Sequence, residues 1–184
     1  MKILLVNNHT NNVDKLIRFL PGDVIVCDKD KFNSGIDLGE YSLIVFSGGS
    51  HIPTVMRHPD YYKEEVYMIQ NTKLPILGIC FGSEVLAVAF GGSVKELNKK
   101  IKGDYLINIK DEAVKNILGD SIKVFEGHTF GVDVLPDCFD IIADSQDGVE
   151  IFKHKEKPIL GLQFHPEIDT NTDLKNWIFN ELIL

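Results

Sequence analysis

The sequence predicts an α/β fold in which a mostly parallel sheet carries helices on both faces. Over the first 90 residues, short apolar runs alternate with helical patterns, which is typical of parallel strands joined by crossover helices. In the second half, strand-like runs follow one another with turn signals between them. This change indicates antiparallel strands added to the parallel core. We therefore expect a mixed sheet in one domain that spans residues 1–184.

Four strands are predicted in the first half of the chain. Each is a short run rich in Ile, Leu and Val that stops at a turn-like segment. They cover residues 2–6, 23–27, 41–46 and 75–79. Helical spacing of apolar residues predicts a helix at 13–20, ended by Pro21-Gly22, and a second helix that opens at Pro59-Asp60.

Five more strands are predicted in the second half. They cover residues 105–109, 122–125, 139–143, 149–152 and 159–164. Turn signals such as Gln146-Asp147-Gly148 separate them. Helices are predicted at 83–90, 111–118 and 172–184, and the last has an apolar stripe that includes Trp177.

Composition and charge exclude several classes of function. The 184-residue chain has a net charge of −8 and no stripe rich in Lys and Arg, so nucleic acid is not an expected partner. Its apolar runs are too short to cross a bilayer, and Asn7-Asn8 interrupts the apolar start too early for a secretory signal. The cysteines, Cys27, Cys80 and Cys138, follow neither a disulfide nor a zinc spacing. We expect a reduced, cytoplasmic protein with no membrane partner, no metal and no cofactor.

Cys80 stands where the predicted strand 75–79 turns directly into a helix, which is the geometry of a nucleophile elbow. The unpaired N–H groups and the dipole of the helix N-terminus would favour a thiolate and lower the pKa of the thiol. Gly78 and Gly82 flank the cysteine and permit a tight turn. A small buried structural cysteine explains this stretch equally well.

Two further segments follow predicted strands directly. His165-Pro166-Glu167 offers a base for a thiol nucleophile and a carboxylate to orient that base, although a surface turn is the simpler interpretation of this segment alone. Ser47-Gly48-Gly49-Ser50 offers either backbone N–H groups for an oxyanion hole or an ordinary strand-to-helix turn. Because the carboxyl ends of parallel strands meet at one edge, we expect both segments to converge with Cys80.

Three motifs together resemble those of the class I glutamine amidotransferases, which use a Cys-His-Glu triad. The motifs are PILGICFG at 75–82, GLQFHPE at 161–167 and FSGG at 46–49. Their order and spacing match the family over nearly the whole chain. The resemblance implies a flavodoxin-like α/β core and hydrolysis of the side-chain amide of glutamine.

The resemblance also implies roles for single residues. Cys80 would be the nucleophile, His165 the base and Glu167 its orienting partner. The oxyanion would be held by backbone N–H groups of Gly49 and Phe81. The residues expected to bind the substrate are Gly48, Gly49, Phe81, Glu84, Thr129 and Phe130, the last two at the amino-acid head of glutamine. His128, in the same segment, is as well explained by a structural role as by substrate contact.

The sequence departs from the family pattern at several positions. Glu84 replaces a usual Gln that contacts the head of the substrate, and Ser50 replaces a frequent Pro. A glycine common after the His-Pro-Glu motif is absent from 169–173. A carboxylate at Glu84 would attract the α-ammonium group of glutamine and repel its α-carboxylate, whereas a neutral amide can serve both groups as donor and acceptor. The sequence therefore predicts that Glu84→Gln lowers the KM for glutamine. A solvated Glu84 on the helix surface is the alternative.

The resemblance predicts a glutaminase domain or subunit that has low activity alone and supplies ammonia to a separate ATP-dependent synthase subunit. The likeness is shared between the GMP synthase type and the anthranilate or aminodeoxychorismate synthase type. The former is slightly preferred and would belong to purine biosynthesis. One alternative is a γ-glutamyl peptide hydrolase that uses the same triad without ammonia transfer. A non-catalytic relative is a further alternative, which the intact Cys80, His165 and Glu167 disfavour.

Overall fold

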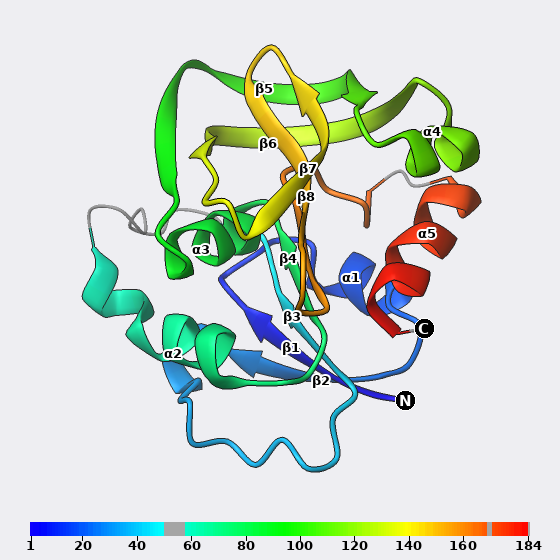
Figure 1. Ribbon diagram of the computed structural model, residues 1–184. Helices are drawn as coiled ribbons and strands as arrows, with labels where there is room; N and C mark the ends of the chain where they lie inside the picture. Colours follow the sequence, from blue (N-terminus) through cyan, green and yellow to red (C-terminus); the bar gives the residue numbers. More distant parts are fainter. Residues whose placement is uncertain (50–57, 169–170, 184) are drawn as a thin grey trace.

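The computed structural model describes residues 1–49, 58–168 and 171–183, and Ser50 lies outside this part of the chain. Its strands form one nine-stranded sheet in the order β2-β1-β3-β4-β9-β8-β7-β5-β6 (Figure 1). The strands are β1 Lys2–Asn7, β2 Asp23–Asp28, β3 Leu43–Phe46, β4 Ile76–Ile79, β5 Ser93–Ile109, β6 Ser121–Val134, β7 Phe139–Ser145, β8 Gly148–His154 and β9 Ile159–Leu162. The helices are α1 Val13–Phe19, α2 Lys63–Asn71, α3 Phe81–Ala89, α4 Glu112–Leu118 and α5 Thr172–Ile183, with short 3-10 helices at Lys29–Lys31 and Pro59–Tyr62.

The parallel half of the sheet runs from β2 to β9. β1 pairs with β2 and β3, β4 pairs with β3 and β9, and all four pairings are parallel. Every residue of β3, β4 and β9 is buried, as expected for parallel strands covered on both faces. The predicted α/β fold with a mostly parallel core is confirmed.

Helices cover both faces of the sheet, and each face has its own apolar core. Alternate side chains of one strand enter different cores, as Leu4 and Leu5 of β1 do. One core contains Leu16 of α1 and Trp177 of α5, and the other contains Leu86 of α3 together with residues of α2. Figure 1 shows α1, α4 and α5 on one side of the sheet and α2 and α3 on the other. Because the helices cover the two faces of the sheet, the edge at which its strands end can carry a site.

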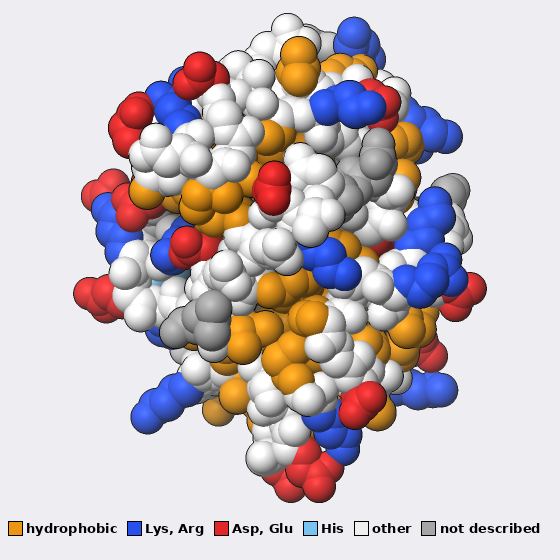
Figure 2. Space-filling model, turned by 90° about the vertical axis from the view of Figure 1, so that its right-hand side faces the viewer, with side chains coloured by type: hydrophobic (Ala, Val, Ile, Leu, Met, Phe, Trp, Pro, Cys, Tyr) orange, Lys and Arg blue, Asp and Glu red, His pale blue; other side chains and the backbone are white. Residues whose placement is uncertain are grey.

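The face over α4 and α5 carries exposed apolar side chains among mixed charges (Figure 2). Ile117 of α4 is 54% exposed, and Ile183 of α5 is 39% exposed. Lys and Arg side chains gather mainly on the right of this view, and Asp and Glu side chains lie mainly on its left and at its lower end. None of the described helices has the length and apolar character needed to cross a membrane.

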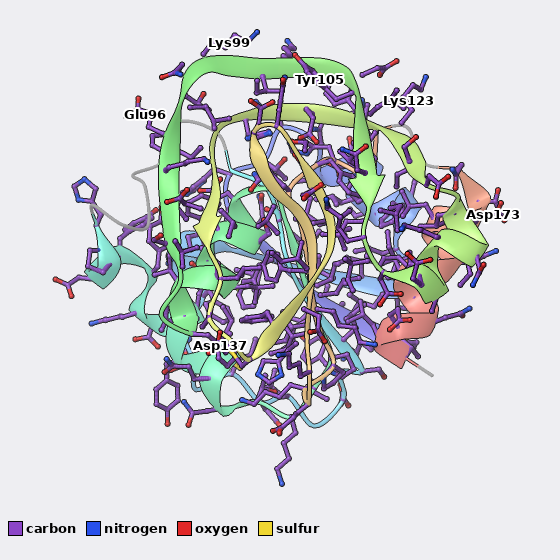
Figure 3. All side chains as sticks on the ribbon, turned by 45° about the horizontal axis from the view of Figure 1, so that its top comes forward. Glu96, Lys99, Tyr105, Lys123, Asp137 and Asp173 are labelled. Atoms are coloured by element: carbon purple, nitrogen blue, oxygen red, sulfur yellow. The ribbon has the colours of Figure 1, made fainter. Side chains whose placement is uncertain are left out.

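The antiparallel half differs most from the prediction. β8, β7, β5 and β6 extend the sheet from β9 by antiparallel pairing. The predicted strands 105–109 and 122–125 are only parts of β5 and β6, which pair as a long two-stranded arm over the rest of the molecule (Figure 1). Residues 93–104 are mostly polar, and Lys99 points outward from the arm (Figure 3). A strand with little buried surface lacks the apolar alternation that sequence analysis detects.

Helix positions agree with the sequence to within a few residues, and the segment predicted to open a helix at Pro59 begins as a 3-10 helix before α2. The difference that matters for the site is the start of α3. α3 begins at Phe81, directly after Cys80, rather than at residue 83. α4 begins after Asp111, whose side chain accepts a hydrogen bond from the N–H of Val114 at 2.9 Å and so caps the helix. The early start of α3 leaves no loop between β4 and the helix, which fixes the position of Cys80.

Candidate active site

The three segments expected at strand ends lie together. β3, β4 and β9 are neighbours in the parallel part of the sheet, and Ser47-Gly48-Gly49, Cys80 and His165 follow their carboxyl ends. A Cβ atom on Gly48 would lie 2.9 Å from Cε1 of His165 and 3.5 Å from Cβ of Cys80. The glycine backbone, the thiol and the imidazole therefore share one site, at the edge where ligands bind in open α/β sheets.

Cys80 occupies a strained turn between β4 and α3. Its backbone angles are φ 50° and ψ −109°, in a region that residues other than glycine rarely adopt. The turn is held on both sides: the N–H of Cys80 donates to the Leu162 carbonyl at 2.7 Å, and the Cys80 carbonyl accepts from Ser83 N–H at 2.9 Å. This is the nucleophile elbow that the sequence predicts, and the surrounding hydrogen bonds maintain its strain.

Gly82 allows the backbone at the start of α3 to pack closely against the end of β3. Its N–H donates to the Ser47 carbonyl at 3.1 Å, and an added Cβ would lie 2.1 Å from the carbonyl oxygen of Phe46. Any larger residue would push α3 away from the strand. The glycine is therefore required by close approach of two backbones rather than by an unusual φ angle.

The imidazole of His165 is fixed from several directions. Its Nδ1 atom lies 2.9 Å from Oε1 of Glu167, and its backbone N–H donates to the Phe125 carbonyl at 2.9 Å. Gly48 and Gly127 contact the ring, since a Cβ on Gly127 would lie 3.3 Å from Cδ2 of His165. His165 and Glu167 are buried, so the surface-turn interpretation of this segment is wrong.

The thiol and the imidazole influence one another's protonation. Burial raises the pKa of the Cys80 thiol, and the charge and hydrogen bonding of His165 act in the opposite direction. Burial lowers the pKa of His165, but Cys80 and then Glu167 outweigh it and raise that pKa to about 11. The expectation that the helix N-terminus lowers the pKa of Cys80 is therefore wrong, because burial dominates. The thiolate is stabilised by the protonated imidazole beside it.

Glu84 lies one turn into α3, and its N–H donates to the Cys80 carbonyl at 3.2 Å. The side chain is only 4% exposed, so the alternative of a solvated helix surface is wrong. Burial raises the pKa of Glu84 to about 8, although a hydrogen bond with Gln163 and the charge of His128 lower it. At neutral pH the carboxyl is thus mainly protonated, and it can donate as well as accept a hydrogen bond, as an amide does.

His128 has a structural role in the strand that carries Thr129 and Phe130. Its Nδ1 atom lies 2.6 Å from the carbonyl oxygen of Phe130, and its Nε2 atom lies 3.0 Å from Oε2 of Glu126. Nε2 of Gln163 also approaches the Phe130 carbonyl, at 3.5 Å. The Phe130 carbonyl is therefore occupied by protein groups.

Sequence reasoning missed several polar residues in and around the site. Gln163, Glu126 and Glu150 are buried, and Lys100 and Lys102 line a pocket beside His165. This pocket has a volume of about 270 Å³ and also touches Gly49 and Gly127. Glu150 stands within the apolar run of β8, Val149 to Phe152, which could have indicated its burial. The two lysines gave no such indication, since their strand was not predicted. The pocket connects the imidazole with the β5–β6 arm and has room for a small amide.

The other reactive side chains do not join the site. Cys27 and Cys138 are partly buried free cysteines that line none of the site pocket. Within residues 1–49, 58–168 and 171–183, no group of three or more His, Cys, Asp and Glu side chains is arranged to hold a metal ion.

The chain is similar to known proteins along nearly its whole length. Residues 4–184 match the family model described as glutamine amidotransferase class-I. The glutamine-hydrolysing GMP synthase subunit of Methanosphaera stadtmanae is 30% identical over 173 residues, which cover 91% of this chain and 89% of that protein. A candidate GMP synthase subunit from Thermoplasma acidophilum has a crystal structure that matches with a TM-score of 0.83 at 30% identity, covering 100% of this chain and 92% of that one. The crystal structure of a glutamine amidotransferase from Thermotoga maritima matches with a TM-score of 0.73 at 26% identity, covering 98% and 81%.

Proposed function

This chain belongs to the class I glutamine amidotransferase family, and from that premise we propose that it is the glutamine-hydrolysing subunit of a two-subunit GMP synthase. The observation that carries the proposal is the shared site of Cys80, His165 and Glu167, in which a cysteine at a strained elbow faces a histidine paired with a carboxylate. These three residues are the proposed catalytic triad.

In the proposed reaction, the Cys80 thiolate attacks the side-chain carbonyl carbon of glutamine. Backbone N–H groups of Gly49 and Phe81 hold the oxyanion that forms. The tetrahedral intermediate collapses, the C–N bond breaks, and protonated His165 gives its proton to the leaving nitrogen, so that ammonia departs. Cys80 then carries a γ-glutamyl thioester. His165 takes a proton from water, the resulting hydroxide attacks the thioester, and glutamate and the thiolate are released.

Glu84 supports glutamine as the substrate despite its difference from the family pattern. Because burial keeps this carboxyl mainly protonated at neutral pH, it places no full negative charge next to the α-carboxylate of glutamine. Two features of the sequence favour a γ-glutamyl peptide substrate, Glu84 in place of the usual Gln and the glycine missing from 169–173, and a protonated Glu84 weakens the first of them. Thr129 and Phe130 remain the proposed backbone contacts for the amino-acid head, although His128 and Gln163 already approach the Phe130 carbonyl.

The proposed partner is a separate synthase subunit that uses ATP and consumes the ammonia. The relatives named as glutamine-hydrolysing GMP synthase subunits are of similar length to this chain, which covers 89% of one of them. Because those relatives are named as one subunit of the enzyme, the synthesis of GMP itself is assigned here to a second subunit. The edge that carries Cys80 and His165 is the proposed docking edge, because ammonia must pass from there to the partner.

The test is reconstitution with the synthase subunit encoded by the same organism. We expect GMP to form with glutamine as the nitrogen donor, and we expect glutaminase activity to be low without the partner. Cys80→Ser should abolish GMP formation from glutamine but retain formation from ammonium salts. High glutaminase activity of the isolated chain with no stimulation by the synthase subunit would contradict the proposed partnership.

A further inference from the structure

A second pocket lies on the other side of β6 from His165. It has a volume of about 220 Å³ and is enclosed by the β5–β6 arm and by the turn between β7 and β8. Its walls include Tyr105, Leu106, Glu126, His128, Asp147 and Glu150. Figure 3 shows Tyr105 on the arm, beside the tip of the β7–β8 hairpin. The side chains of β6 alternate, so that Phe125 and Gly127 line the pocket at His165 while Glu126 and His128 line this one.

Two buried carboxyl groups face this pocket without enough hydrogen-bond donors. Glu126 is 1% exposed and Glu150 is 2% exposed. Oε2 of Glu126 lies 3.0 Å from Nε2 of His128, and Oε1 of Glu150 accepts from Oγ of Ser145 at 2.6 Å. Oε1 of Glu126 and Oε2 of Glu150 receive no hydrogen bond from any other described group. The two carboxyl groups instead share a hydrogen bond with each other while Glu150 is protonated, and a ligand that brings its own donors can replace that proton. Such buried acceptors are costly unless a donor reaches them, so the pocket favours a ligand that brings donors.

The chemistry of the walls selects among such ligands. A primary ammonium group has three N–H donors and a positive charge, which together complement both free oxygens. The described residues hold no group of side chains arranged for a metal ion. At the mouth, Leu106 is 67% exposed and Ile101 adds a second apolar wall, which suits a short alkyl chain. We infer that this pocket binds a primary alkylammonium ion, with its head on Glu126 and Glu150 and its chain along Leu106.

Binding would be transmitted toward the site of glutamine hydrolysis. His128 contacts Glu126 through Nε2 and the Phe130 carbonyl through Nδ1. A cation on Glu126 competes with His128 for that carboxyl group and so changes the support of the segment 127–130. This second consequence rests on the proposed function, because it concerns glutamine binding. The binding of the amine itself does not depend on that function.

The binding is also linked to pH. Burial and then the neighbouring Glu126 carboxylate raise the pKa of Glu150 to about 9, and Asp147 acts in the same direction. The other charged group that faces this pair is His128, which is paired with Glu126. A bound ammonium stabilises the ionised form of Glu150 and releases its proton. The apparent affinity for an amine that stays charged therefore rises between pH 7 and pH 9.

Thermal unfolding of the full chain tests the proposal with n-butylammonium, ammonium and tetramethylammonium chlorides at equal ionic strength. We expect n-butylammonium to raise the Tm in a saturable manner and tetramethylammonium, which has no N–H donor, to have no such effect. Glu150→Gln should weaken binding about tenfold, because one charge-assisted contact is lost. Asp104→Asn, on the same arm but outside the pocket, should bind like the unchanged protein.

Leu106→Ala provides a test that does not alter a buried group. Because Leu106 is largely exposed, the variant should fold normally, bind n-butylammonium more weakly and leave the effect of ammonium unchanged. An equal Tm shift with tetramethylammonium, the absence of any amine-specific shift, or unchanged binding in both variants would overturn the proposal. A shift with ammonium as large as that with n-butylammonium would overturn the place assigned to the alkyl chain.

Discussion

Nδ1 of His165 lies 2.9 Å from Oε1 of Glu167, and both side chains are buried at the end of β9. The carboxylate therefore orients the imidazole with Nε2 available to Cys80 and stabilises its protonated form. Only Pro166 separates the two residues, and its fixed φ limits how far their backbones can move apart. This short connection makes the base and its orienting group one rigid unit.

Glu167→Gln should remove the charge that stabilises protonated His165. Because Glu167 raises the pKa of His165, its loss lowers that pKa, and the alkaline limb of the kcat profile should move to lower pH. We also expect kcat to fall by roughly tenfold to a hundredfold, in line with the loss of a charge-assisted hydrogen bond. Glu156→Gln, an exposed residue that lines no part of the site pocket, is the control. An unchanged pH profile in Glu167→Gln would show that the carboxylate does not act through His165.

Gly127→Ala should disturb the position of the imidazole. The added Cβ would lie 3.3 Å from Cδ2 and 3.4 Å from Nε2 of His165, so the ring must shift by a few tenths of an ångström. Catalysis depends on such distances, and we expect kcat to fall by about tenfold or more with little change in KM. Gly131→Ala on the same strand meets its nearest neighbours only at 3.8 and 4.0 Å and should retain full activity. Equal kcat values for the two variants would contradict a role for Gly127 in seating the ring.

Glu84→Gln should have little effect on the KM for glutamine at neutral pH and a clear effect on it at alkaline pH. The pKa of about 8 means that Glu84 is mostly neutral at pH 7, so the substitution should change the KM for glutamine by less than about twofold there. Above pH 8, ionised Glu84 repels the α-carboxylate of glutamine and raises the KM of the unchanged protein. That rise should be absent from the variant. This differs from the lowered KM predicted from the sequence, because the sequence did not show that Glu84 is buried. A higher KM for the variant at pH 7 would instead favour a γ-glutamyl peptide as the substrate.

The same carboxyl group should affect stability. Its pKa is raised from 4.5 to about 8 on folding, so the folded state binds more protons than the unfolded state between these values. The free energy of unfolding therefore decreases as pH rises from about 4.5 to about 8, by up to roughly 1.4 kcal/mol per pH unit for this group. Relative to the unchanged protein, Glu84→Gln should become more stable over this window. Urea unfolding at pH 5 and pH 8 measures the difference, and an equal difference at both pH values would show that Glu84 does not titrate there.

The sequence was sufficient to predict the parallel core and the meeting of Cys80, His165 and Gly48. Those elements are short apolar runs, and parallel strands bring their carboxyl ends together whatever the details of packing. The β5–β6 arm could not be predicted in full, because the first part of β5 has little buried surface and the buried side chains of β6 include the polar Glu126 and His128. The burial of Glu84, Glu126 and Glu150 was equally hidden, since it results from tertiary contacts and opposes the usual preference of Glu for the surface.

The most direct test of the central claim is covalent labelling of the folded protein with a glutamine-like electrophile, followed by peptide mapping. If Cys80 is the nucleophile paired with His165, it should be labelled in preference to Cys27 and Cys138, and excess glutamine should protect it. Cys80 is the most buried of the three, so accessibility alone would give the opposite order. Equal labelling of the three cysteines, or labelling of Cys80 that glutamine does not slow, would contradict the account.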